Sequence, residues 1–255
     1  MIKVLSIAGS DPSGGAGIQV DLKTFQALGA FGMAIPAALT FQNSKGVAGT
    51  EPVPPRALSR QLEVLVSDIR PDAVKTGMLL TKQVISEVAK IVKEHGIRTV
   101  IVDPIVRSSS GRLLLMPEGI NALKKQLFPL ALLITPNIPE AEILTGVKIR
   151  TEEDMDYAAG KLLDMGPKYV LIKGGHRTGP AVDTLYGGHS VLSFSTERLK
   201  GEFHGTGCVL SSAIAVFISQ GLPVEKAVEK GKQFVEKMLK KAERVGKGKT
   251  KYFQL

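Results

Sequence analysis

Groups that can do chemistry are concentrated in one short segment, where a glycine-rich turn leads into an apolar helix. The segment reads EFHGTGCVLSSAIAVF over residues 202–217 and holds the only cysteine of the chain, Cys208. Gly205 and Gly207 allow successive backbone N–H groups to point toward one place, where the helix dipole is also positive. Such helix starts bind anions, phosphate above all, although Gly-Thr-Gly also occurs in plain tight turns. A cysteine there can be a packing residue, a metal ligand, a redox group, a nucleophile or a base.

Three further residues carry groups that suit phosphate chemistry. Asn137 and Glu140 place a carbonyl oxygen and a carboxylate one helical turn apart, and a hydrated Mg²⁺ accepts both as ligands. The same spacing also predicts a capping box at a helix start. Lys173 ends an apolar strand just before two glycines, where it can reach a phosphate or extend its ammonium group to solvent. Spacing alone leaves these alternatives open.

The residue pattern excludes several other kinds of site. One cysteine rules out a disulfide framework and multi-cysteine metal centres. None of the four histidines has a metal-ligand spacing to another histidine or to Cys208. A second glycine-rich turn, GSDPSGGAG at 9–17, lacks the G-x-G-x-x-G spacing of dinucleotide-binding folds and the Gly-Lys-Ser/Thr ending of a P-loop. A nicotinamide-dependent reaction is therefore not indicated.

The elements that must position these groups alternate between short apolar strands and amphipathic helices. Strands are predicted at 3–9, 33–39, 72–77, 98–104, 131–137 and 168–175, and a β-hairpin at 184–195 turns at Gly187 and Gly188. Helices are predicted at 16–29, 55–69, 81–96, 117–128, 139–146, 152–166, 207–220 and 223–244. Pro36 predicts an edge or a bulge for its strand. The alternation predicts one α/β domain with a mainly parallel sheet between two layers of helices, and a ligand site at the carboxyl ends of the strands.

Composition and charge add two expectations. The 255 residues are 44% hydrophobic and 22% charged. They contain no apolar run of the roughly 18 residues that a membrane span needs, which predicts a cytoplasmic protein. The formal net charge is +9, and residues 226–251 alone carry +7, from ten lysines and arginines against three glutamates. Because Phe234 is the only aromatic residue of that segment, a solvated helix face with a frayed tail is favoured over a nucleic-acid or lipid surface.

Taken together, the motifs resemble those of one enzyme family. In chain order they read AGSDPSGGAGIQVDLKTFQALGAFG, QNSKGV, KTGML, ITPNIPEAEILTG, LIKGGH and HGTGCVLSSAIA. This set resembles the hydroxymethylpyrimidine/phosphomethylpyrimidine kinases of thiamine biosynthesis, which are ribokinase-like proteins. The resemblance implies a single three-layer αβα domain over 1–245, a basic C-terminal tail over 246–255 and a homodimer. It further implies ATP- and Mg²⁺-dependent phosphorylation of 4-amino-5-hydroxymethyl-2-methylpyrimidine and then of its monophosphate.

The resemblance also implies roles for the residues that match the family pattern. Its catalytic residues would be Lys173, near the transferring phosphoryl group, and Cys208, as the base for the substrate hydroxyl. The anion hole would be formed by Gly205, Thr206 and Gly207. Substrate would contact Gly9, Asp21, Gln42, Met78 and Ile105. The nucleotide would lie at Asn137, Lys173 and Thr206, and Mg²⁺ at Asp103, Asn137 and Glu140. Because a helix N-terminus favours a thiolate, we expect a lowered pKa for Cys208.

Two features differ from the family pattern, and two alternative functions stay open. The loop at 105–111 offers Arg107 where relatives often have a lysine, and the end of the chain lacks their Gly-His-Gly-rich motif. The nearest alternative is a pyridoxal or pyridoxine kinase of the same branch, although Gln42 suits the edge of an aminopyrimidine and Met78 its ring. The other is a catalytically inactive pyrimidine-binding regulator, which would have no need of Lys173.

Overall fold

A computed structural model describes residues 1–255 except 108–110, 112, 176–180 and 189. The strands are β1 (Lys3–Ser10), β2 (Phe31–Asn43), β3 (Gly46–Pro52), β4 (Ala73–Thr76), β5 (Val100–Val102), β6 (Leu133–Ile134), β7 (Tyr169–Lys173), β8 (Ala181–Gly187), β9 (Ser190–Thr196), β10 (Glu243–Arg244) and β11 (Lys251–Tyr252). The helices are α1 (Gly17–Ala27), α2 (Pro55–Asp68), α3 (Lys82–Glu94), α4 (Pro117–Ala122), α5 (Ile138–Thr145), α6 (Glu152–Leu163), α7 (Thr206–Ser219) and α8 (Val224–Leu239). After α4 come a π-helical turn, η1 (Leu123–Leu127), and a 3-10 turn, η2 (Phe128–Leu130).

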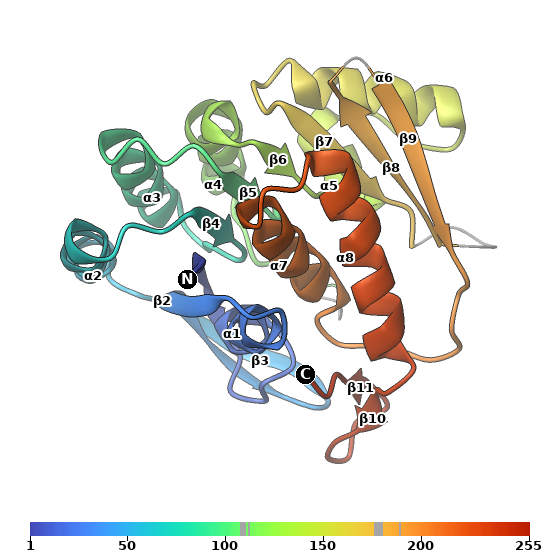
Figure 1. The fold of residues 1–255 in the computed structure, drawn as a ribbon, viewed down its shortest axis with the longest axis horizontal. Helices are drawn as coiled ribbons and strands as arrows, with labels where there is room; N and C mark the ends of the chain where they lie inside the picture. Colours follow the sequence, from blue (N-terminus) through green and yellow to red (C-terminus); the bar gives the residue numbers. More distant parts are fainter. Residues whose placement is uncertain (108–110, 112, 176–180, 189) are drawn as a thin grey trace.

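One mixed sheet runs through the molecule (Figure 1). Over the described residues it has nine strands in the order β3-β2-β1-β4-β5-β6-β7-β8-β9, and β10 and β11 form a separate two-stranded ribbon. The six strands from β2 to β7 in this order are parallel. β3 at one edge and β8 and β9 at the other are added antiparallel. The predicted, mostly parallel α/β sheet is confirmed.

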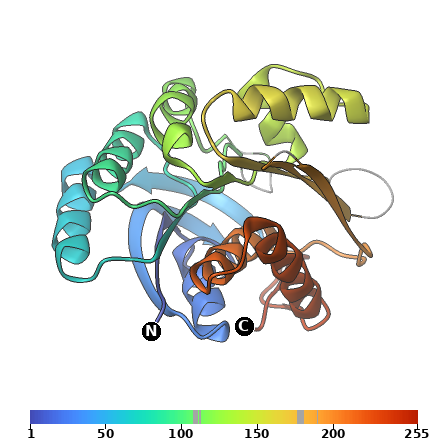
Figure 2. The same ribbon diagram turned by 45° about the horizontal axis from the view of Figure 1, so that its top comes forward.

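Helices cover both faces of the sheet and give three layers (Figure 2). α2 to α6 lie on one face, and α1, α7 and α8 lie on the other. The central strands are buried on both sides, because successive side chains of a strand point to opposite faces. In β4, for example, Val74 belongs to one core and Ala73 to the other. α7 is apolar on nearly every side and is buried from Cys208 to Val216, so it lies deepest in its layer. None of the helices in the described part of the chain could cross a membrane.

β1 is an inner strand of the parallel set, second in the order from β2 to β7. It pairs with β2 on one side and with β4 on the other. The register with β2 shifts between Ala8 and Gly9, where Pro36 pairs with Ala8, which confirms the bulge expected at that proline. The parallel strands end at one edge of the sheet, so the turns after β1, β4, β5, β6 and β7 meet there.

Two segments differ from the sequence-based expectation. β2 continues past residue 39 to Asn43 and returns as β3, and these two strands form a hairpin. α8 ends at Leu239 rather than at 244, and the tail that follows is not frayed. Tyr252 and Phe253 are only 7% exposed, because burial of aromatic side chains draws this lysine-rich segment back onto the domain. The prediction of a frayed tail is wrong.

Candidate active site

The start of α7 forms a backbone site at the carboxyl edge of the sheet. Gly205 precedes α7 with a φ of 77°, a left-handed conformation that suits glycine. A Cβ at this position would overlap the carbonyl oxygen of Gly15, so the turn packs against the first glycine-rich turn of the chain. Glycine has no side chain to cap the first amides of the helix. The predicted anion hole at Gly205, Thr206 and Gly207 is therefore the N-terminus of a buried helix, with glycine at the cap.

An ion pair lies directly against this helix start. The Lys173 ammonium nitrogen is 2.7 Å from Asp103 Oδ1, and the hydroxyl of Thr135 donates to the same carboxylate oxygen at 3.1 Å. A Cβ built on Gly207 would lie 2.9 Å from Lys173 Nζ and 3.6 Å from Asp103 Oδ2. The absence of a side chain at Gly207 thus leaves room for the ammonium group beside the first turn of α7. The structure brings the predicted residues Lys173, Asp103 and Gly207 together.

Burial and charge act on Lys173 in opposite directions. Burial by itself lowers the pKa of this ammonium group, but the negative charges of Asp103 and Glu140 raise the pKa above its ordinary value. The side chain of Lys173 keeps 15% of its surface exposed, against 2% for that of Asp103. Lys173 is therefore a partly exposed cation at neutral pH, beside the first turn of α7.

Asn137 and Glu140 form the capping box that their spacing allowed. Asn137 Oδ1 accepts from the Glu140 amide at 2.8 Å, and Glu140 Oε2 accepts from the Asn137 amide at 2.9 Å. Glu140 is 4% exposed. Burial raises the pKa of its carboxyl, Lys173 lowers it and Asp103 raises it further, to about 7 in all. The box uses the single side-chain oxygen of Asn137 and one oxygen of Glu140, whose carboxylate also accepts a hydrogen bond from the Val106 backbone, so a ligand role would use the remaining lone pairs of these oxygens.

The same carboxylates were predicted to hold Mg²⁺. Within the described residues, no group of three or more histidine, cysteine, aspartate or glutamate side chains could hold a metal ion. Mg²⁺ usually keeps several waters and needs only one or two carboxylates beside the phosphates of a nucleotide. Asp103 and Glu140 both act on the charge of Lys173, so two carboxylates are close to one ammonium group. This donor set fits a hydrated cation shared with phosphate and does not fit an all-protein metal cage.

Cys208 differs from the expectation of a lowered pKa. Burial raises the pKa of the thiol; Lys75 lowers it and Asp21 raises it, to about 11 in all. The side chain belongs to the core beneath α7, with the residue 5% exposed, and the Gly17 amide makes a hydrogen bond that lowers the pKa only in part. The dipole of α7 acts on the sulfur, but desolvation outweighs it. In the ligand-free protein the thiol is therefore protonated at neutral pH. The prediction of a lowered pKa for Cys208 is wrong.

Asp21 also differs from its expected place beside the substrate. It has no exposed surface, and its carboxylate is 2.8 Å from Lys75 Nζ in a fully buried ion pair. The hydroxyls of Ser6 and Ser212 donate to its two oxygens at 2.6 and 2.8 Å. With both oxygens used inside the core, Asp21 joins α1 to β1, β4 and α7 and offers no surface to a ligand. This residue has a structural role.

Gln42 lies in a polar network that the sequence did not predict. Its side-chain amide is 2.6 Å from Nε2 of His204, and the same nitrogen is 2.9 Å from Asp11 Oδ2. Burial opposes the ionisation of Asp11, but hydrogen bonds from His204 and Ser13 lower its pKa below the ordinary value. His204 directly precedes Gly205, so the contact with His204 brings Gln42 close to the predicted anion hole. Asp11 and His204 lie in the two glycine-rich turns of the sequence, and their polar side chains in these motifs could have indicated the network.

Gly9, Met78 and Ile105 come together as predicted. Met78 packs with Ala38 and Leu114, and Ile105 lies against the same cluster. The methyl group of Met78 covers Gly9 so closely that a Cβ there would be 2.5 Å from it. These residues form an apolar surface at the ends of β1, β4 and β5, which suits one face of a flat ring.

The contacts described for Arg107 are to its own loop. Its guanidinium donates to the carbonyl oxygen of Gly111 at 3.1 Å, and a bridge joins Arg107 to Leu113. The serines at 108–110 of the same motif, and His176 of the KGGH motif, lie outside the described residues.

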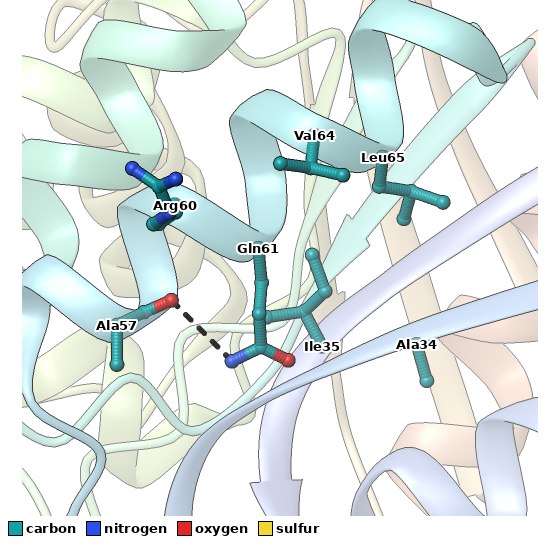
Figure 3. A pocket seen from close by; sticks show the side chains of 7 residues that line it. All are labelled: Ala34, Ile35, Ala57, Arg60, Gln61, Val64 and Leu65. Carbon is teal, nitrogen blue, oxygen red and sulfur yellow. Dashed lines mark hydrogen bonds between the residues drawn. The ribbon is translucent and has the colours of Figure 1, made fainter.

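A hollow elsewhere on the surface carries none of the predicted site residues (Figure 3). It measures about 600 Å³ and lies between α2 and β2. Its lining is Ala34, Ile35, Ala57, Arg60, Gln61, Val64 and Leu65. Gln61 donates to the carbonyl oxygen of Ala57 in its own helix at 3.4 Å. Arg60 is its single charged lining residue, so this hollow lacks the convergent polar groups found at the start of α7.

Comparison with known proteins agrees with the motifs of this site. The family model for phosphomethylpyrimidine kinase matches residues 11–252. The chain is 44% identical over 247 residues to the thiamine biosynthesis bifunctional protein ThiED of Geobacter sulfurreducens, covering 96% of this chain and 50% of that protein. It thus spans half the length of this relative. It is also 41% identical over 249 residues to the hydroxymethylpyrimidine/phosphomethylpyrimidine kinase of Bacillus subtilis, covering 96% and 92%.

Solved structures with the same fold include both a phosphomethylpyrimidine kinase and a pyridoxal kinase. Phosphomethylpyrimidine kinase from Clostridium difficile superposes with a TM-score of 0.84 at 43% identity, over 94% of this chain and 100% of that one. Pyridoxal kinase from Staphylococcus aureus in complex with AMP-PCP and pyridoxal superposes with a TM-score of 0.89 at 32% identity, over 99% and 93%. Sequence identity is therefore higher to the pyrimidine kinase, whereas both share the fold.

Proposed function

Since the chain belongs to the phosphomethylpyrimidine kinase family, we propose that it phosphorylates 4-amino-5-hydroxymethyl-2-methylpyrimidine with ATP and then phosphorylates the resulting monophosphate. This places it in thiamine biosynthesis, as the names of its relatives do for them. The observation that carries the proposal is the convergence of Lys173 and Asp103 on the glycine-bounded start of α7. A pure pyrimidine-binding regulator has no need of that arrangement.

Phosphoryl transfer depends chiefly on position and on charge neutralisation, because its transition state is loose and carries negative charge on the transferring group. The amides of Thr206, Gly207 and Cys208 at the start of α7 supply fixed dipoles. Lys173 supplies a full positive charge 2.7 Å from Asp103, and that carboxylate fixes the direction of the ammonium group. These groups hold the phosphate chain of ATP against the substrate hydroxyl in the proposed reaction.

Mg²⁺ is the expected metal of the reaction, and its ligands would be Asp103, Glu140 and Asn137. When bound, it would neutralise phosphate charge and orient the nucleotide. The residues present suit this role, because Glu140 is a buried carboxyl whose pKa is raised to about 7 and a nearby cation would favour its ionised form. Asn137 keeps its capping bond to Glu140, which orients both side chains toward the same edge of the sheet.

Cys208 is the proposed base for the substrate hydroxyl. Its pKa of about 11 in the ligand-free protein means that it is a thiol at neutral pH, so it can accept the hydroxyl proton only from the minor thiolate form, after its own proton has been lost to solvent. Lys75 favours the thiolate by its charge, although burial opposes it more strongly. We therefore assign the larger share of catalysis to α7 and Lys173, and a smaller one to Cys208.

The ring of the substrate is proposed to lie between two surfaces. Met78, Ile105 and Gly9 provide the apolar one, and Gln42 provides the amide that pairs with the aminopyrimidine edge. Asp21 takes no part, because it is fully buried in its pair with Lys75. A pyridoxal kinase activity is the second candidate, since pyridoxal kinases share the fold at 32% identity.

The proposal is tested by incubating the protein with Mg-ATP and, separately, with hydroxymethylpyrimidine, its monophosphate, pyridoxine and pyridoxal. ADP release and the mass of each product are followed. We expect both pyrimidines to be turned over with a kcat/KM at least about tenfold above either vitamin B6 compound, a difference of about 1.4 kcal/mol. Faster turnover of pyridoxal would establish the second candidate, and no turnover of any of the four would favour a regulator. We also propose a cytoplasmic homodimer, which light scattering after gel filtration would test for its stoichiometry.

A further inference from the structure

The C-terminal hairpin touches three segments that surround the proposed substrate side of the site. Figure 1 shows β10 and β11 beside the turn that joins β2 to β3. Gly248 N donates to Ser44 Oγ in that turn at 3.0 Å. Lys251 N donates to the carbonyl oxygen of Glu202 at 2.8 Å, and His204 N donates to that of Lys251 at 3.0 Å. The hairpin is therefore attached to the segment that leads directly into Gly205.

Tyr252 of this hairpin packs against His204. The two ring centroids are 5.4 Å apart, and the rings meet edge to face at 65°. The Tyr252 hydroxyl donates to Ser13 Oγ at 3.3 Å. A Cβ on Gly15 would lie 2.5 Å from both rings, so the glycine at 15 is what lets the first glycine-rich turn close over them. The imidazole is thereby confined on one side by Tyr252.

On its other side His204 is confined by Asp11 and Gln42. A carboxylate only accepts hydrogen bonds, so the contact of 2.9 Å between His204 Nε2 and Asp11 Oδ2 places the Nε2 proton toward Asp11. Asp11 is itself held by the amides of Gly15 and Ala16, at 3.2 and 2.8 Å. The side-chain amide of Gln42 lies 2.6 Å from the same ring nitrogen; because a protonated ring nitrogen only donates, the amide must turn its carbonyl oxygen toward the imidazole and its NH₂ group away from it. The position of the imidazole therefore fixes where the Gln42 amide lies and which way it faces.

We propose that Tyr252 and His204 are positioning residues for the substrate-recognising amide of Gln42, and that the C-terminal hairpin is thus a specificity element of the enzyme. This inference rests on the proposed function, because it assigns Gln42 to the ring of the substrate. The contacts described for the hairpin are to the turns near Gln42 and not to Lys173 or Asp103. Loss of the Tyr252 ring frees the imidazole, so that the amide loses its fixed direction while the phosphoryl-transfer groups stay in place.

Two Tyr252 variants of the full-length chain and one matched control test this inference. Tyr252→Ala removes the ring, Tyr252→Leu fills part of its volume without an aromatic edge, and Tyr252→Phe keeps the ring and removes only the contact with Ser13. We expect the KM for the pyrimidine to rise by about tenfold in the first two, which is the effect of losing about one well-directed hydrogen bond. The KM for ATP should change less than about twofold, and Tyr252→Phe should stay within about twofold of the wild type in both. The preference for pyrimidine over pyridoxal should fall in parallel with the rise in KM.

A spectroscopic measurement separates positioning from general loosening. The ring nitrogens of His204 are assigned in the ¹⁵N spectrum by comparison with His204→Gln, and the Nε2-protonated form is expected in the wild type and in Tyr252→Phe. In Tyr252→Leu the shift should move toward that of a solvent-exposed imidazole. An unchanged KM for the pyrimidine in Tyr252→Ala and Tyr252→Leu would overturn the inference. An equal rise of the KM for the pyrimidine and of the KM for ATP would overturn it as well. Should the wild type turn over pyridoxal alone, the proposed function would be wrong, and the KM for pyridoxal would then decide on Tyr252 by the same criteria.

Discussion

Replacing Glu140 by glutamine should make the ligand-free protein more stable at pH 8, although it removes a residue of the proposed metal site. Burial raises the pKa of Glu140, Lys173 lowers it and Asp103 raises it further, from 4.5 to about 7. An ionised Glu140 is thus held in the folded protein at a cost in free energy. Glutamine carries no charge and can take the same place in a capping box, so its contact with the Asn137 amide is retained.

The magnitude follows from the two pKa values. The carboxyl ionises near pH 4.5 in the unfolded chain and near pH 7 in the folded protein. Between these values the folded protein binds a proton that the unfolded chain has lost. The free energy of unfolding therefore falls as the pH rises through this window, and it is constant above the window as far as Glu140 is concerned. The total is about 3 kcal/mol, so the advantage of Glu140→Gln should grow by about that amount between pH 4 and pH 8.

Urea unfolding at the two pH values measures this difference. The chain has no tryptophan, so far-UV circular dichroism is the suitable signal. Glu142→Gln is the matched control in the same helix, because a hydrogen bond from Ile149 and one from Lys148 lower the pKa of Glu142, and the variant should gain nothing at pH 8. Adding Mg²⁺ with ADP should stabilise the wild type more than Glu140→Gln. The reasoning is refuted if Glu140→Gln has the same advantage at both pH values or is the less stable protein at pH 8.

Three further substitutions test the site. Lys173→Met should lower kcat by about 10²–10³-fold in the ADP-release assay, because a positive charge at the start of α7 is lost; a loss below about threefold would contradict its role. Cys208→Ala should lower kcat by about 10²-fold, near the lower end for a general base, since burial raises the thiol pKa to about 11; unchanged turnover would remove Cys208 from the mechanism. Asp21→Asn should lower the free energy of unfolding by about 3–5 kcal/mol, since Lys75 then keeps a buried charge without its partner. The KM for the pyrimidine should stay the same in Asp21→Asn, and a raised KM without loss of stability would show that Asp21 contacts substrate after all.

The predicted architecture follows from periodicity, because each strand and helix carries its own apolar pattern. The β2–β3 hairpin lacked such a pattern. Residues 43–52 are rich in Gly, Ser and Thr, and β3 forms because it pairs with the long β2. The lysine-rich composition of the end of the chain suggested a frayed tail. The structure of this segment depends instead on contacts of Tyr252 and its neighbours with segments about 50 to 240 residues away. Long-range pairing of this kind leaves little local signal.

The sequence predicted which residues of the site lie close together, because their motifs follow neighbouring strands. It did not predict the protonation state of a residue that depends on burial and on nearby charges. Lys173 and Asp103 meet because both follow parallel strands at one sheet edge. The prediction of a thiolate at Cys208 was wrong, because burial of this apolar helix raises the thiol pKa by more than the helix dipole and Lys75 lower it, and the sequence does not give the relative size of these effects. Asp21 and Lys75 are charged residues within apolar patterns, and this shared feature is the signal that could have paired them.

The buried pair of Asp21 and Lys75 also restricts how this sequence can change. Losing either partner alone strands a charge in the core, whereas replacing both by apolar residues of similar volume is often neutral or stabilising. The hydroxyls of Ser6 and Ser212 that serve the same carboxylate would then need new partners or replacement as well. A route to an apolar core therefore passes through less stable single variants and involves four positions on four elements. Substitutions at these four positions are therefore expected to be non-additive: each single change lowers the free energy of unfolding, and the combined change restores it.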